Sequence, residues 1–190
     1  MAERVDVEFE GHVAIVRLAR PEKMNAMSPA MFEGLIAAGE TLSARPEVRC
    51  VVLTGEGRAF CAGIDMQRFD EAAVKASKLP RLLAERTHGI ANIAQKVAIQ
   101  WRELTPPVIA AVHGVAFGAG FQIALGADIR YVEPATRMSV MEVEWGLAPD
   151  MAGTVLMRSL ARDDVVRELT YTGRIFSGVE AQGYGFATRV

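Results

Sequence analysis

Signals for several common protein classes are missing from this 190-residue sequence. Its 21 basic and 23 acidic residues give a net charge of −2, so the basic footprint of a nucleic-acid-binding protein is absent. The first residues, MAERVDVEFEGH, lack the apolar stretch of a secretion signal. Two cysteines, Cys50 and Cys61, are too few for a disulfide framework and lack metal-ligand spacing. We therefore expect a soluble cytoplasmic protein.

Charge is also absent from one long stretch, because residues 106–127 include no Asp, Glu, Lys or Arg. This span is long enough to cross a membrane as a helix. Two prolines, four glycines and two polar side chains interrupt it, however, and would expose a broken backbone to lipid. We interpret the stretch as a strand at 106–112, a turn at Gly114 and a helix at 119–125, and expect no membrane partner.

Apolar patterns elsewhere predict alternating strands and helices. Ser28 and Pro29 are typical of an N-cap followed by the first residue of a helix. The short apolar run at 49–55, which includes Cys50 as a small buried residue, is typical of a strand buried on both faces. This alternation predicts a single α/β domain with helices packed over largely buried strands. The predicted strands are 5–9, 13–18, 49–55, 106–112, 127–132, 139–143 and 186–190. The predicted helices are 29–43, one that begins near Asp65, one within 79–101 with Ile90 on its apolar face, one that begins at about Gly153, and 165–171.

The glycines after the third apolar run have several interpretations. A dinucleotide-binding loop needs G-x-G-x-x-G, but Ile123 stands at the last glycine position, and no phosphate loop of the G-x-x-x-x-G-K-[ST] type occurs. A glycine turn before a helix can also leave main-chain N–H groups free to hold an oxygen that becomes negative during a reaction. A second such turn lies at 59–66, so two donors could converge on one thioester oxygen. Alternatively, both turns merely let helices pack closely on strands.

Five segments of the sequence resemble the crotonase, or enoyl-CoA hydratase/isomerase, superfamily, in the family's order and over nearly the whole chain. They are GHVAIVRLARPEKMNAM, LTGEGRAFCAGIDM, AVHGVAFGAGFQIALGADIRY, EVEWGLAPDMAGT and ELTYTGRIFSGVEAQGYGFATRV. The resemblance implies a spiral of ββα units, an acyl-CoA substrate that brings its own CoA, no other cofactor, and a trimer or hexamer. The family usually continues with C-terminal helices, whereas this chain stops at Val190, so we expect a more exposed pocket and an altered oligomer.

The resemblance also assigns residues to the site. The two main-chain donors to the thioester oxygen would be those of Ala62 and Ala119. Alanine in place of the family's usual glycine is tolerated at 119 if its φ is negative. Further substrate-binding positions carried over from the family are Cys61, Gly63, Ile64, Asp65 and Gly120 around the pocket, and Lys23 and Met24 near the adenine end.

The side chains that would move protons only partly match the family. Its hydratases use two glutamates, and this sequence has Gln122 at the first position and Glu142 at the second. Burial would raise the pKa of Glu142 and suit it to act as a base. Glu144 would share its strand face if the strand continued. Asp150 matches an acidic position of the dienoyl-CoA isomerase branch, although it could instead cap a helix.

Three functions therefore remain open. The first is hydration of a 2-enoyl-CoA in fatty-acid metabolism, with Glu142 as base and Gln122 orienting the water. The second is enoyl- or dienoyl-CoA isomerisation, in which one carboxylate removes and returns a proton. The third is binding of acyl-CoA, or an assembly role, without catalysis.

Overall fold

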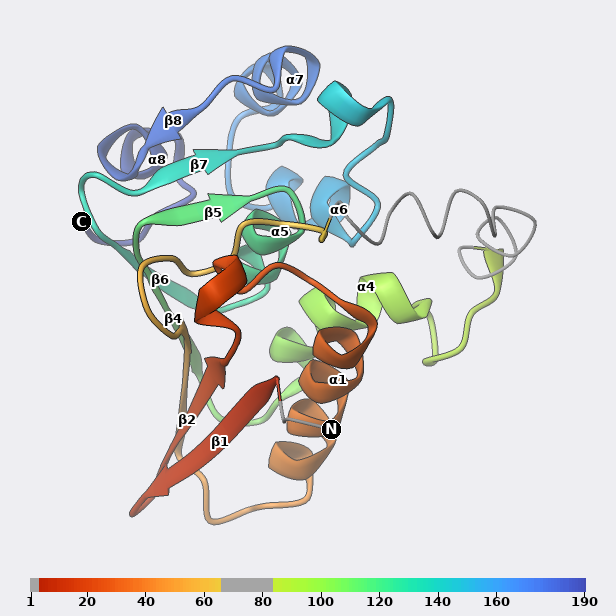
Figure 1. Cartoon of the computed structure of the whole chain (residues 1–190), viewed down its shortest axis with the longest axis vertical. Coiled ribbons are helices and arrows are strands. Elements are labelled where there is room, and N and C mark those ends of the chain that lie inside the picture. Colours follow the sequence, from red (N-terminus) through yellow and green to blue (C-terminus); the bar gives the residue numbers. More distant parts are fainter. Residues whose placement is uncertain (1–3, 66–83) are drawn as a thin grey trace.

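The computed structural model of the chain describes residues 4–65 and 84–190, and its strands form two sheets (Figure 1). The larger sheet has the order β1-β2-β3-β4-β6, and the smaller has the order β5-β7-β8. An antiparallel hairpin, β1–β2, opens the larger sheet, and its other neighbours pair in parallel. The strands are β1 (Val5–Glu10), β2 (Val13–Leu18), β3 (Cys50–Gly55), β4 (Val108–Val112), β5 (Val115–Phe117), β6 (Ile129–Val132), β7 (Arg137–Ser139) and β8 (Phe176–Ser177).

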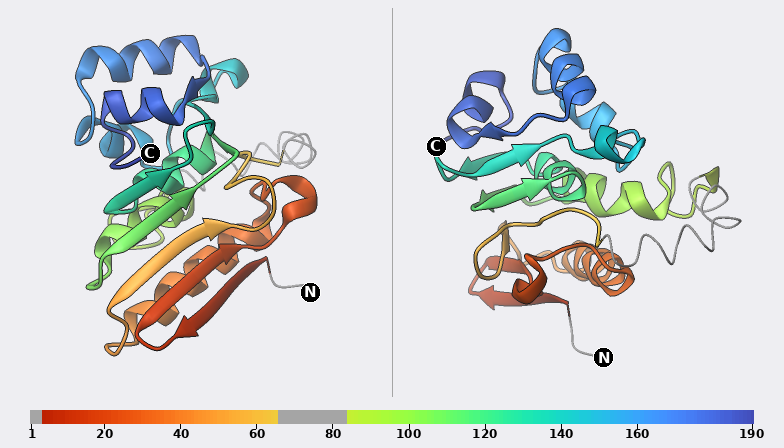
Figure 2. Two further views of the ribbon diagram at one scale, coloured as in Figure 1. Left: turned by 90° about the vertical axis from the view of Figure 1, so that its left-hand side faces the viewer. Right: turned by 45° about the horizontal axis from the view of Figure 1, so that its top comes forward.

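Four of the α-helices lie in two pairs at the sheets, and α5 and α6 lie between these pairs (Figure 1). In the views of Figure 1 and Figure 2, α1 and α4 run along one face of the larger sheet, whereas α7 and α8 lie beyond the smaller sheet. None of the helices in the described residues is long and apolar enough to cross a membrane. The α-helices are α1 (Pro29–Ser43), α4 (Ile93–Ile99), α5 (Ala119–Leu125), α6 (Gly153–Arg158), α7 (Asp163–Thr172) and α8 (Gly178–Tyr184), and the 3-10 helices are η1 (Pro21–Lys23), η2 (Gln100–Glu103) and η3 (Glu142–Trp145).

Helix α1 begins and ends where the sequence predicts. The Ser28 hydroxyl accepts a hydrogen bond from the N–H of Met31, and Pro29 occupies the first helical position. Met31, Leu35 and Leu42 form its buried stripe and join the core. Their spacing puts them on one face of the helix, which turns that face toward the sheet.

Strand β3 is buried on one face and not on both, so that prediction is wrong. Val51 and Leu53 are fully buried, whereas the residues that alternate with them are partly exposed. Cys50 is one of the partly exposed residues. The reason is that α1 and α4 cover one face of the larger sheet and leave the other less covered (Figure 2).

Several predicted elements differ in the structure. The strand predicted at 139–143 ends at Ser139, and residues 142–145 turn into η3, which Gly146 closes with a positive φ of 66°. The final segment contributes an isolated bridge from Arg189 to Tyr131 in place of a strand. Ile90 is 81% exposed and lies outside α4, so it belongs to no apolar helix face. Strands β5 and β8 and helix α8 were not predicted, and the helix predicted from near Asp65 lies outside the described residues.

Candidate functional site

The bend at residues 61–65 runs beside strand β5 and reaches the start of helix α5. The N–H of Cys61 donates to the carbonyl of Val115 at 3.0 Å, and the N–H of Phe117 donates to the carbonyl of Cys61 at 3.1 Å. A Cβ on Gly120 would overlap the Cys61 carbonyl oxygen, so close packing explains this glycine. The two glycine turns of the sequence therefore meet at one place.

Each of the two turns offers one free main-chain donor. Only one of these donors, the N–H of Ala119, is at a position that the sequence predicts. The N–H of Ala62 already donates to the carbonyl of Met24 at 2.9 Å, so it is engaged within the protein. Ile64, two residues on, has an N–H without an acceptor among residues 4–65 and 84–190. The N–H of Ala119, at the first position of α5, also lacks an acceptor in this part of the chain. At this bend the free N–H is therefore that of Ile64 and not that of Ala62, where the sequence predicts it.

Both free donors border the same cavity. A Cβ built on Gly63 would lie 4.0 Å from the Ala119 nitrogen, which places the bend against the start of α5. Ala119 has no positive φ, which is the condition under which alanine is tolerated there. The cavity has a volume of about 130 Å³ and is lined by Ala62, Gly63, Ile64, Phe117, Gly118, Ala119, Met141, Glu142, Trp145 and Leu147.

The other predicted substrate-binding residues do not line this cavity. Cys61 is fully buried, and burial raises the pKa of its thiol to about 12. Gly120 packs on Cys61, and Asp65 is buried in an ion pair with Arg20. Met24 touches the bend through its carbonyl, while contact of Lys23 and Met24 with an adenine stays a prediction.

Four apolar residues of the lining were not predicted: Phe117, Met141, Trp145 and Leu147. Each flanks a motif residue, but an apolar residue beside a motif is equally typical of the core. Trp145 and Leu147 are 52% and 44% exposed, which follows from their place on and just after the η3 turn. Their exposure leaves an apolar wall beside the cavity.

Glu142 is the carboxylate that this cavity contains. Its Oε1 accepts a 2.6 Å hydrogen bond from Nε2 of Gln122, and a Cβ on Gly118 would lie 3.1 Å from the same oxygen. Burial raises the pKa of the Glu142 carboxyl most strongly; the Gln122 hydrogen bond lowers this pKa, and the negative charge of Asp150 raises it. Glu144 is exposed, because η3 turns it away from the side occupied by Glu142. The structure thus separates the two glutamates that the sequence left equivalent.

Gln122 and Asp150 occupy different surroundings. Gln122 is fully buried, does not line the cavity, and accepts a 2.9 Å hydrogen bond from the N–H of Gly153 on Oε1. A role in orienting a water inside the cavity is therefore not supported. Asp150 is exposed, although partial burial raises the pKa of its carboxyl. It does not cap α6, whose N-cap is Ala152.

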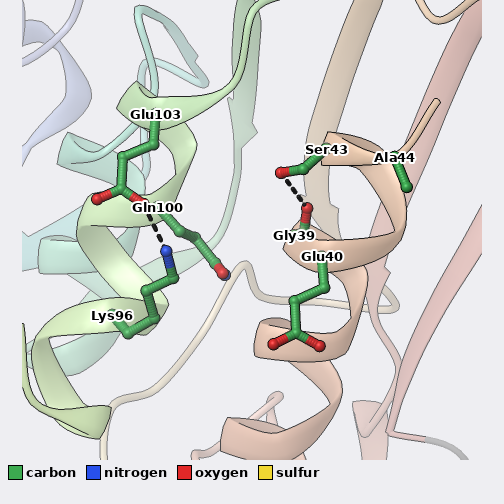
Figure 3. Close-up of a pocket in the computed structure, with 7 residues that line it drawn as sticks. All are labelled: Gly39, Glu40, Ser43, Ala44, Lys96, Gln100 and Glu103. Atoms are coloured by element: carbon green, nitrogen blue, oxygen red, sulfur yellow. Dashed lines mark hydrogen bonds and ion pairs between the residues drawn. The ribbon is translucent and has the colours of Figure 1, made fainter. Parts of the chain in front are cut away.

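A larger cleft of about 330 Å³ lies between α1 and α4 (Figure 3). Two of its three charged side chains, Lys96 and Glu103, form an ion pair with each other, and the third is Glu40. The Ser43 hydroxyl donates to the Gly39 carbonyl, and the Gln100 amide donates to the Leu35 carbonyl. The described residues hold no group of three or more His, Cys, Asp or Glu side chains placed to bind a metal ion. The smaller cavity, with free main-chain donors beside a carboxylate, is therefore the candidate site.

Comparisons with known proteins identify the family of this chain. A family model described as enoyl-CoA hydratase/isomerase matches residues 8–190. The enoyl-CoA hydratase EchA19 of Mycobacterium tuberculosis is 31% identical over 184 residues, which are 97% of this chain and 66% of the relative. The mitochondrial Delta(3,5)-Delta(2,4)-dienoyl-CoA isomerase of Mus musculus is 33% identical over 182 residues, which are 94% of this chain and 55% of that relative. The chain therefore spans about two thirds of the first relative and about half of the second.

A solved structure covers the whole chain. A protein from Thermobifida fusca YX, crystallised in complex with acetoacetyl-CoA, is 32% identical and superposes with a TM-score of 0.87. The match covers 100% of this chain and 74% of that one. The mixed α/β architecture, with its parallel and antiparallel strands, is thus that of the crotonase fold.

Proposed function

This chain belongs to the enoyl-CoA hydratase/isomerase family, and we propose that it binds an acyl-CoA thioester and shifts a carbon–carbon double bond. The observation that carries the proposal is the placement of one carboxylate, Glu142, in the same cavity as the free amides of Ile64 and Ala119. A family resemblance alone would leave hydration and isomerisation equal.

In this proposal the thioester oxygen of the substrate accepts hydrogen bonds from the N–H groups of Ile64 and Ala119. These donors stabilise the negative charge that develops when the carbon beside the carbonyl loses a proton. Each such donor accounts for a factor of about 10² to 10³ in rate in well-studied enzymes. Because both groups belong to the main chain, their positions are fixed by the fold before substrate binds.

Glu142 then acts as the base in the reaction. Its carboxylate takes a proton from C2 of a 3-enoyl-CoA, and the electron pair of that C–H bond forms the enolate. Glu142 returns the proton to C4, the double bond moves from C3–C4 to C2–C3, and the carboxylate is regenerated. A raised pKa favours both halves of this exchange near neutral pH.

Hydration of a 2-enoyl-CoA is the second candidate, and Asp150 is the observation that favours it. Its charge raises the pKa of Glu142, so the two carboxyl groups lie within electrostatic range of one another. In this second candidate Glu142 activates a water in the cavity, and the charge of Asp150, which lies outside the cavity lining, makes Glu142 a stronger base. An action in fatty-acid metabolism, a cytoplasmic location and assembly as a trimer or hexamer remain predictions from the resemblance.

A panel of 2-enoyl-, 3-enoyl- and dienoyl-CoA thioesters tests the proposal, with ultraviolet detection of the conjugated thioester and identification of each product by mass spectrometry. We expect 3-enoyl-CoA to give the conjugated 2-enoyl product. Addition of water to 2-enoyl-CoA, without any double-bond shift, would instead establish the hydratase. Calorimetric binding without any product would establish a non-catalytic acyl-CoA-binding protein and contradict the proposal.

A further inference from the structure

Gln122 connects the carboxylate of Glu142 to the start of helix α6. Its Nε2 lies 2.6 Å from Glu142 Oε1, and its Oε1 lies 2.9 Å from the nitrogen of Gly153, the first residue of α6. Gln122 belongs to α5, and its side chain is completely buried and is not part of the cavity lining. The amide therefore acts on the candidate site through its hydrogen bond to Glu142.

The orientation of this amide has a single solution. The main-chain N–H of Gly153 can only donate, so the oxygen of the Gln122 amide must face it. The NH2 group must then face Glu142, whose Oε1 becomes an acceptor. The second oxygen of the carboxyl, Oε2, is buried and has no hydrogen-bond partner among the described residues. The two oxygens of Glu142 are thus inequivalent.

We propose that Gln122 is a positioning residue, which holds Oε1 of Glu142 as a permanent acceptor and reserves Oε2 for the proton in transit. This inference rests on the proposed function, because it assigns the oxygen that removes and returns the substrate proton. The carbonyl oxygen of a carboxylic acid is the better acceptor, so the protonated form keeps its hydrogen on Oε2. One oxygen on one side of the substrate then performs both transfers.

Gly153 is part of the same arrangement. A Cβ at this position would overlap Oε1 of Gln122 and would lie 2.8 Å from its Cδ. Any larger residue at position 153 must therefore displace the amide that faces Glu142. Asp150, in the loop before α6, is the charged group that acts on Glu142 from this side. The loop thus acts on the Glu142 carboxyl through the charge of Asp150, and the start of α6 acts on it through the Gln122 amide.

The direct test is the titration of the Glu142 carboxyl by NMR of protein with ¹³C-labelled glutamate, with E142Q used to assign the signal. Replacing Gln122 by methionine keeps the length of the side chain and removes the N–H donor that favours the charged carboxylate. In Gln122→Met we expect the midpoint of the Glu142 titration to rise by about 1 pH unit. The kcat for the double-bond shift should fall roughly 10-fold, with KM changed much less.

A buried glutamine elsewhere supplies the matched control. Gln100 is 2% exposed and its amide donates to the main-chain carbonyl of Leu35, but it borders the cleft between α1 and α4 (Figure 3). Gln100→Met should cost stability and leave the Glu142 titration unchanged. If Gln122→Met does not fold, Gly153→Ala displaces the same amide and should raise the midpoint too. Gly183→Ala is its control, because a Cβ at Gly183 meets nothing within 4 Å.

A folded Gln122→Met protein with the wild-type midpoint and the wild-type kcat would overturn the inference. The same holds for Gly153→Ala if it is the variant that folds. Failure of the proposed function is a separate result, namely wild-type protein that turns over none of the enoyl-CoA thioesters. In that case a raised midpoint in Gln122→Met would still establish that the amide positions Glu142.

Discussion

The guanidinium of Arg20 lies 2.7 Å from Oδ2 of Asp65, and both side chains are buried. Asp65 directly follows Ile64, whose N–H is one of the two free donors of the candidate site. The same junction includes a hydrogen bond from the N–H of Met27 to the carbonyl of Gly63 at 2.7 Å. The ion pair therefore anchors the loop at 20–27 to the bend that carries the donor.

Breaking this pair should weaken both the fold and the site. Removal of one partner from a buried ion pair typically costs about 3–5 kcal/mol, because the other charge remains in the interior. We expect Arg20→Met to lower the free energy of unfolding by an amount of this order and to lower kcat as the bend shifts. Denaturant unfolding of Arg20→Met, Asp65→Asn and the double variant measures the coupling.

The two single variants and the double variant form a double-mutant cycle. Its control is the same cycle on Arg162 and Asp164, which are 2.8 Å apart and whose side chains are 78% and 68% exposed. Solvent screens such a pair, so its cycle should show no measurable coupling. Equal coupling at the two pairs would mean that Arg20 and Asp65 do not anchor the bend.

Removing the charge of Glu142 should stabilise the protein at neutral and higher pH. Burial raises the pKa of this carboxyl in the folded state, so folding favours its protonated form. Its contribution to stability is fully present below the unfolded pKa of about 4.3, and is lost as pH rises through the raised folded pKa. Glu142→Gln cannot ionise, so its Tm at pH 8 should exceed that of the wild type by about 2–4 °C, an effect of about 1 kcal/mol.

This gain should shrink as the pH falls from 8 toward 5, and calorimetric scans across that range measure it. Glu144→Gln removes an exposed charge two residues away and should show no such trend. A Tm gain that is constant with pH would contradict the assignment of the effect to ionisation of Glu142.

The main-chain donor of Ala119 can be removed without a polar side chain being touched. Ala119 is the first residue of α5, a position where proline is well tolerated and supplies no N–H. We expect Ala119→Pro to lower kcat about 10²- to 10³-fold, in line with the loss of one donor to a developing oxyanion. The measurement is steady-state turnover, with circular dichroism to check the fold.

Asp163→Pro is the matched control, because Asp163 is the first residue of α7 and lies outside the cavity lining. It should leave kcat within about twofold of the wild type, since it removes no donor from the cavity. A folded Ala119→Pro protein with wild-type turnover would show that this amide holds no reacting atom.

The sequence predicts the elements that local chemistry determines. The start of α1 follows from Ser28 and Pro29, and α5 begins directly after the glycine turn at Gly118. Strands β5 and β8 escape prediction because two or three residues are too few for a periodic pattern. The η3 turn depends on the positive φ of Gly146. The apolar run before this turn predicts that the strand continues, so the sequence does not indicate the turn.

The sequence predicts which two turns form the candidate site, but not every residue that carries a free amide there. Two glycine turns with free amides could be expected, yet the choice of Ile64 over Ala62 depends on a carbonyl 38 residues upstream, that of Met24. A contact between distant segments leaves no pattern within either one. The same holds for Gln122, because its partner Gly153 lies on another helix and reveals the bridge only in three dimensions.

Proton transfer at the carbon beside a thioester carbonyl tests the central claim most directly. Each protein is incubated with a 3-enoyl-CoA in deuterated water, and NMR follows the loss of the C2 protons and the formation of the conjugated product. We predict that the wild type and Glu144→Gln react at the same rate, and that Glu142→Gln reacts at least about 100-fold more slowly. Equal rates for the wild type and Glu142→Gln, or no reaction by the wild type, would contradict the account.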